Sequence, residues 1–276
     1  MTVGSSAPSS SGTDRAVLLT SLLDDLAAES ADLDARVAEL DEKAWRTCTP
    51  ARGWDVHDSV THLAATDADA LAALQGAEAF AAVLDRVLAH GTDYVDRVVE
   101  QGRSVPSGEL LEQWRAGRTA LQQAVRVTDP SARIPWFGPA MSPASFVTAR
   151  LMETWAHGQD VVDALGQTRP STARLRSVAE IGVRARPFAY AAHGRPLPDA
   201  AVRVELAGPV GEHWTWGPPD VDDRIAGPAL DFCLLVTQRR ARADLDLSVA
   251  GQAADEWASI AQAFAGPPGA GRQAQA

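Results

Sequence analysis

The spacing of apolar residues changes once along this chain, near residues 166–170, and the change predicts two kinds of structure. Before it, from residue 14 to about residue 165, apolar residues recur every three or four positions, as on one face of an α-helix. After it, short segments such as 202–206 and 213–216 alternate apolar and polar residues, as half-buried strands do. A chain of 276 residues is long enough for two ordinary domains. We therefore predict a two-domain α+β protein, with a helical domain at residues 14–168 and a small α+β domain at residues 169–266.

Four major helices are expected in the first domain. They span residues 14–40, 55–74, 109–127 and 142–165, and a helical insertion at 78–101 breaks at Gly91. Residues 129–143 contain several prolines and are expected to form a loop. Ser142 and Pro143 are residue types preferred at the cap and the first position of a helix. Long helices joined by loops favour an antiparallel four-helix bundle.

The second domain mixes helices and strands. We expect helices at 171–192, 228–239 and 253–264, and strands at 202–206, 213–216, 223–226 and 245–249. The turn at 208–211 makes a hairpin of the first two strands. Residues 1–13 and 267–276 are rich in small residues and proline, and we expect them to be disordered tails.

Charge and composition exclude several classes of function. A net charge of −11 argues against a nucleic-acid-binding surface and against a surface for anionic lipids. The sequence shows neither the apolar run of a membrane span nor a signal peptide. Cys48 and Cys233 are too few for a disulfide framework and are expected to be inert free thiols in a reducing cytoplasm. We expect a cytoplasmic monomer or homodimer whose partner is a small molecule.

Two segments far apart in the sequence carry candidate metal ligands. Glu153 and His157 are four residues apart, which places them on one face of a helix. His62 lies in the second turn of another predicted helix, and bundle metal sites are built from facing helices. Two histidines and one carboxylate are the ligand count of an open catalytic metal site. The alternative is a solvated Glu153–His157 pair and a hydrogen-bonded core histidine at position 62.

The sequences GWDVHDSVTHL (53–63) and ETWAHGQD (153–160) together resemble the mycothiol-dependent maleylpyruvate isomerase family. The resemblance implies that the N-terminal domain is a DinB-like four-helix metal-binding bundle. Residues 225–240 and 261–268 resemble the second domain of an actinobacterial branch, which is similar to sterol-carrier-like α+β folds. Arginine makes up 24 of the 25 lysine and arginine residues, as is typical of GC-rich genomes.

The same resemblance implies roles for individual residues. His62, Glu153 and His157 would bind the metal, most simply zinc. Asp58 and Asp160 match acidic positions of the same motifs and would orient the ligating histidines. The alternatives are that Asp58 is a plain helical partner of His62 and that Asp160 is a surface acid.

Two arginines complete the set of candidates, because the pocket of a ring-opened dicarboxylate isomerase needs cations. We take Asp160 and Arg239 as catalytic candidates, and Arg239 and Arg240 as candidates for binding the cofactor. The alternative is a solvated pair of charges at a helix C-terminus. The remaining histidines show no such spacing and are expected at the surface: His57, His90, His193 and His213.

Three functions are compatible with such a site. A thiol bound to the metal is deprotonated and becomes a nucleophile. Neither cysteine is near the motifs, so the thiol would be a small molecule; the family implies mycothiol, acting on an electrophilic substrate as an S-transferase or isomerase. The second possibility is a hydrolase in which the metal activates water, with Asp160 as the candidate base. The third is a metal-dependent ligand-binding module without turnover.

Overall fold

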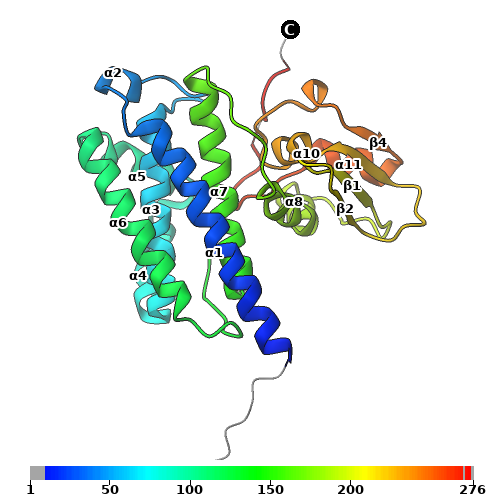
Figure 1. Ribbon diagram of the computed structural model, residues 1–276, viewed down its shortest axis with the longest axis horizontal. Helices are drawn as coiled ribbons and strands as arrows, with labels where there is room; N and C mark the ends of the chain where they lie inside the picture. Colours follow the sequence, from blue (N-terminus) through cyan, green and yellow to red (C-terminus); the bar gives the residue numbers. More distant parts are fainter. Residues whose placement is uncertain (1–9, 270, 275–276) are drawn as a thin grey trace, which may run out of the picture. The chain divides into compact units, whose positions relative to one another are not determined.

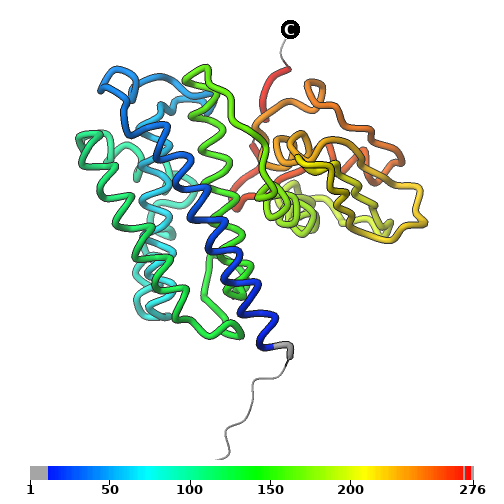
Figure 2. Tube along the Cα trace, in the orientation of Figure 1, coloured from blue at the N-terminus to red at the C-terminus, as the bar shows by residue number. Residues whose placement is uncertain are grey.

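The computed structural model describes residues 10–269 and 271–274 (Figures 1 and 2). These residues form two compact units. Within the described part, the first unit contains residues up to Arg46 together with His57–Arg150, and the second contains Thr47–Val56 and the chain from Leu151 onward. The predicted two-domain α+β class is confirmed. The chain passes between units at residue 150, inside a helix. That two separately folding domains meet near residue 168 stays a prediction.

The helical region follows the predicted pattern closely. Its elements are α1 (Ser10–Val37), α2 (Glu42–Trp45), α3 (Val56–Gln75), α4 (Ala77–His90), η1 (Gly91–Asp93), α5 (Tyr94–Gly102), α6 (Ser107–Arg126) and α7 (Pro143–Ala164). Ser142 caps α7, since its Oγ accepts a hydrogen bond from the Ser145 amide at 3.2 Å. Helix α1 begins earlier than expected, so residues 10–13 are helical; the rest of the predicted N-terminal tail lies outside the described residues.

Apolar side chains and one charged cluster hold the first unit together. Each fully buried aliphatic or aromatic side chain contributes about 1.5–3 kcal/mol. Between α1 and α6, Asp34 accepts hydrogen bonds from Arg115 at 2.7 Å and from Arg118. The hydrogen bond from Arg115 is the main cause of a lowered pKa at the Asp34 carboxyl. The largest buried side chains of this unit include Leu23, Leu33, Leu63, Phe80, Trp114, Leu121 and Phe146.

A four-stranded mixed sheet forms the centre of the second unit (Figure 1). Its strands are β1 (Arg203–Ala207), β2 (His213–Trp216), β3 (Arg224–Pro228) and β4 (Ser248–Ala250), in the order β2-β1-β3-β4. Strand β1 pairs antiparallel with β2 and parallel with β3. The helices are α8 (Leu175–Arg184), α9 (Arg186–Ala192), α10 (Ala229–Val236) and α11 (Gln252–Ile260), with the short helix η2 (Arg242–Asp244). Val204, Leu206, Trp214 and Ile225 make one sheet face apolar and buried.

Helices α8 and α10 pack closely because of a glycine. A Cβ at Gly182 would lie 2.6 Å from Cγ2 of Val236, which is closer than side chains approach each other. Glycine at this position therefore permits contact between the two helices. None of the described helices is both long enough and apolar enough to cross a membrane.

Several predicted boundaries in the second unit are wrong. The single helix expected at 171–192 begins at Leu175 and breaks at Ala185, because Pro187 lacks an amide hydrogen and its ring disfavours a continuous helix. Strand β4 starts late, since the Asp246 amide donates to the Asp231 carboxylate at 2.7 Å. Helix α11 ends at Ile260, after which the Ala263 amide donates to the Val236 carbonyl at 2.8 Å.

Candidate metal centre

Helices α3 and α7 carry the three side chains predicted to bind a metal ion. One ligand atom each from His62, Glu153 and His157 lies within 4.8 Å of the other two. On α7, His157 Nε2 is 3.5 Å from Glu153 Oε2. Ligands of one tetrahedral zinc ion, at about 2.0–2.2 Å from the metal, are separated by about 3.4 Å. Two imidazoles and a carboxylate at such distances fit a divalent metal ion.

His157 is held between an aromatic ring and a second carboxylate. The Trp54 ring stacks on the imidazole, with 5.7 Å between ring centroids and 19° between planes. On the opposite side of the imidazole from Glu153, Nδ1 lies 3.5 Å from Asp160 Oδ2. Nε2 therefore faces the candidate ligand Glu153, and Nδ1 faces the buried Asp160. Asp160 is placed where an orienting residue would have to be, although that role stays a prediction.

A buried ion pair lies one turn beyond His62 on α3. Arg150 Nε donates to Asp67 Oδ1 at 3.0 Å, and Arg150 Nη2 donates to the Thr66 hydroxyl at 2.8 Å. Burial raises the pKa of Asp67, and the charge of Arg150 opposes that shift. The sequence held a signal for this contact, because Arg150 is three residues before Glu153 and shares its face of α7.

Asp58 has a partner that the sequence did not indicate. Arg103 donates to both of its carboxylate oxygens, from Nε at 3.0 Å and from Nη2 at 2.8 Å. This bidentate geometry fixes Asp58 near the start of α3. Its predicted role in orienting His62 stays a prediction.

His57 is buried, so its expected place at the surface is wrong. Its Nε2 lies 2.9 Å from the Val105 carbonyl, and its Nδ1 lies 3.3 Å from the Thr61 hydroxyl. Asp55, His57 and Asp58 also bring ligand atoms within 4.8 Å of one another. With both ring nitrogens at hydrogen-bond distance from protein groups, His57 is suited to a structural role.

The two arginines after α10 bind acids of α7. The amides of Gln238 and Arg239 donate to the carbonyls of Leu235 and Leu234 at 3.0 and 2.8 Å, and Gln238 adopts a φ of 57°. This is the hydrogen-bond pattern of a Schellman turn, and it ends the helix three residues before the predicted position.

The turn directs the arginines toward Asp160 and Asp163. Arg239 Nη2 donates to Asp160 Oδ2 at 2.9 Å, and Arg240 donates to both oxygens of Asp163 at 2.5 and 2.7 Å. The hydrogen bond to Asp163 raises the pKa of Arg240. The alternative of a solvated charge pair is wrong, since the Arg239 side chain is only 11% exposed.

The two cysteines differ in environment. Cys233 is a buried free thiol, and burial raises its pKa, as expected of an inert structural residue. Cys48 is a free thiol as expected, but it is exposed, and its inertness stays a prediction. It forms a backbone bridge with Asp55, and this bridge closes the loop that carries Trp54.

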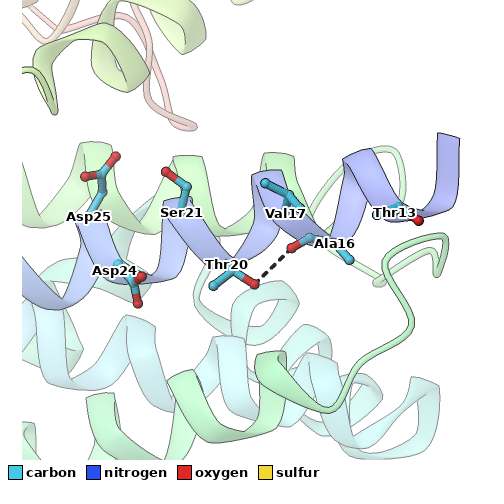
Figure 3. A pocket seen from close by; sticks show the side chains of 7 residues that line it. All are labelled: Thr13, Ala16, Val17, Thr20, Ser21, Asp24 and Asp25. Carbon is cyan, nitrogen blue, oxygen red and sulfur yellow. Dashed lines mark hydrogen bonds between the residues drawn. The ribbon is translucent and has the colours of Figure 1, made fainter. Parts of the chain in front are cut away.

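A surface hollow along α1 is separate from these residues (Figure 3). All of its lining residues belong to that one helix, and the Thr20 hydroxyl donates to the Ala16 carbonyl at 2.9 Å. It contains none of the candidate ligands. The lining residues are Thr13, Ala16, Val17, Thr20, Ser21, Asp24 and Asp25.

Known proteins resemble both parts of the chain. Residues 26–162 match the family described as the mycothiol maleylpyruvate isomerase N-terminal domain, and residues 198–247 match the family described as wyosine base formation. Uncharacterized proteins from two strains of Mycobacterium tuberculosis are 48% identical over 248 residues, covering 90% of this chain and 96% of each relative. The predicted likeness of the second domain to sterol-carrier-like folds stays a prediction.

Solved structures share the fold at low identity. The crystal structures of the mycothiol-dependent maleylpyruvate isomerase and of a point mutant of it match with a TM-score of 0.58. They cover 83% of this chain and 92% of theirs, at 14% and 13% identity. The predicted DinB-like fold is confirmed by this match.

Proposed function

Because this chain belongs to the mycothiol-dependent maleylpyruvate isomerase family, we propose that it is a metal-dependent enzyme that uses a small-molecule thiol. The thiol is mycothiol, and the substrate is an electrophilic small molecule that is isomerised or joined to the thiol. The observation that carries this proposal is the group formed by His62, Glu153 and His157, whose ligand atoms lie within 4.8 Å of one another.

In this proposal the three side chains hold one divalent metal ion, with zinc as the candidate. The ion supplies a positive centre that favours the deprotonated form of a coordinated thiol. Asp160, whose Oδ2 lies 3.5 Å from Nδ1 of His157, favours the tautomer with its proton on that nitrogen and so leaves Nε2 available as a ligand. Trp54 covers one face of the imidazole and excludes water from it. Arg239, fixed by Asp160, and Arg240, fixed by Asp163, are the candidates for holding anionic groups of the thiol or substrate.

Hydrolysis is the weaker alternative, because the structure leaves no role for Asp160 as a base. Its side chain is fully buried, and each carboxylate oxygen accepts a hydrogen bond from a different guanidinium, at 2.9 Å from Arg239 and 2.7 Å from Arg272. A carboxylate held in this way is shielded from water and has both oxygens engaged by guanidiniums. We therefore propose Asp160 as a positioning residue.

Thiol-dependent turnover tests the proposal. Zinc-loaded protein is incubated with maleylpyruvate, and with alkyl halides and epoxides, in the presence and absence of mycothiol, and products are followed by mass spectrometry. We expect conversion only with the thiol, and we expect Glu153→Gln to abolish it. Glu78→Gln, an exposed position on α4, is the matched control and should retain activity. Full conversion in thiol-free buffer would support hydrolysis, and no conversion of any probe would support a binding module.

A further inference from the structure

The C-terminal segment, residues 261–269 and 271–274, is held against other parts of the second unit (red in Figure 2). Gln238 Nε2 donates to the Ala261 carbonyl at 3.2 Å, and the Ala263 amide donates to the Val236 carbonyl at 2.8 Å. Near its end, Arg272 donates to the Pro50 carbonyl through Nη1. The predicted disordered tail therefore contains an anchored residue.

Arg272 and Arg239 share a single carboxylate. Arg272 Nη2 donates to Asp160 Oδ1 at 2.7 Å, while Arg239 Nη2 donates to Oδ2 at 2.9 Å. Burial is the main cause of a lowered pKa at Arg272, and the charge of Arg239 lowers it further against the opposing effect of Asp160. With Arg240 and Asp163 included, three guanidiniums lie beside two carboxylates, which leaves one positive charge in excess. One further anion would remove this imbalance.

Each of these arginines also has an unused donor. The Nε atoms of Arg239 and Arg272 are buried and have no hydrogen-bond partner among the described residues. Buried donors in folded proteins almost always have an acceptor, so two such atoms on neighbouring guanidiniums need an explanation. An acceptor-only group such as a carboxylate can bind both.

We propose that Arg272 joins Arg239 to bind the carboxylate of a small acidic ligand, so that the C-terminal segment forms part of the binding site. A carboxylate matches the single excess positive charge, whereas a phosphate dianion would exceed it. The proposal rests on the proposed function only in taking this ligand to be the substrate. Binding itself requires neither the metal nor the thiol.

Calorimetric titration with maleate, as a carboxylate probe, tests this site on metal-free and zinc-loaded protein. We expect wild-type protein to bind maleate in both forms. Arg272→Gln should raise the Kd at least about tenfold, as expected for losing a charged hydrogen-bond donor. Arg272→Lys should recover only part of the affinity, because it keeps the charge and loses the Nε donor. Arg242→Gln removes an exposed arginine paired with Asp255 in the same unit, and should bind like wild type.

A second measurement does not depend on any variant. In ¹⁵N spectra of arginine side chains, maleate should shift the Nε–H signals of Arg239 and Arg272, which a purely structural role would leave unchanged. Absence of maleate binding to wild type, unchanged affinity in Arg272→Gln, or unshifted Nε–H signals would overturn the proposal. If maleate binds as expected but no thiol-dependent turnover occurs, the proposed function fails and the carboxylate site stands.

Discussion

His157 is constrained on three sides, and each constraint suits its proposed role as a metal ligand. Its Nε2 lies 3.5 Å from Glu153, its Nδ1 lies 3.5 Å from Asp160, and Trp54 stacks on its ring. An imidazole ligates a metal through a deprotonated nitrogen, so the proton has to reside on the other nitrogen. The carboxylate at Nδ1 favours that tautomer.

Replacing Asp160 by Asn should therefore weaken zinc binding. The neutral amide is a poorer acceptor for the Nδ1 proton, and loss of such a partner lowers metal affinity by about 10–100-fold. Competition with a zinc chelator measures this change. Asp163→Asn, on the same helix and bonded to Arg240, is the control and should retain wild-type affinity. Equal zinc affinities in all three proteins would show that Asp160 does not act through His157.

The cysteines allow a second prediction at the same scale. Native protein treated with iodoacetamide should be labelled at Cys48, which is exposed, and not at Cys233, whose burial raises its pKa and shields it. Cys48→Ser should retain full mycothiol-dependent turnover, because the reacting thiol is proposed to be a small molecule. Peptide mass spectrometry and the turnover assay measure these outcomes. Loss of turnover in Cys48→Ser would mean that the chain supplies its own nucleophile.

At the scale of helices, a buried ion pair connects α3 and α7 close to the ligands. Arg150 and Asp67 have side chains that are only 4% and 7% exposed. A pair of this kind contributes little compared with apolar packing, but removal of one partner leaves a buried charge uncompensated. The pair therefore makes the alignment of these two helices sensitive to a single substitution.

Arg150→Met should lower the free energy of unfolding by about 3–5 kcal/mol, measured by urea denaturation. Arg126→Met is the matched control, since Arg126 of α6 also binds an aspartate of another helix, Asp24 of α1, but the two side chains are 46% and 67% exposed. An exposed pair should contribute less than about 1 kcal/mol. Similar losses for both variants would mean that burial does not decide the contribution of the α3–α7 pair.

Apolar periodicity was sufficient to predict the long helices of the first unit, because one buried stripe specifies each of them. It failed at the ends of helices and strands that are set by hydrogen bonds of the folded chain. The Schellman turn at Gln238 and the bond from Asp246 to Asp231 are of this kind. The break before α9 was readable in Pro187 and was missed.

The candidate site was likewise predictable from the sequence only in part. Helical spacing and family motifs predicted the group of His62, Glu153 and His157, which the structure brings together. The contacts of Trp54 and Arg272 come from a loop and from the end of the chain, and no periodic signal describes those segments. Residues of this kind become visible only in the folded protein.

For the whole molecule, the charge distribution is uneven. The chain carries a net charge of −11, yet Arg239, Arg240 and Arg272 gather around two aspartates of α7. A local positive region in an acidic protein favours small acidic ligands over polyanions, because the remaining surface repels extended negative chains. This distribution agrees with a small-molecule enzyme.

Metal content tests the central claim most directly. Purified protein is reconstituted with zinc, freed of excess metal and analysed by inductively coupled plasma mass spectrometry. We expect one zinc ion per wild-type chain, none in His157→Ala, and one in His193→Ala, where the replaced imidazole lies 2.9 Å from the Ala189 carbonyl of α9. Far-UV circular dichroism should show equal helicity in all three proteins. Wild-type protein with full helicity and no stoichiometric metal after reconstitution would contradict the account.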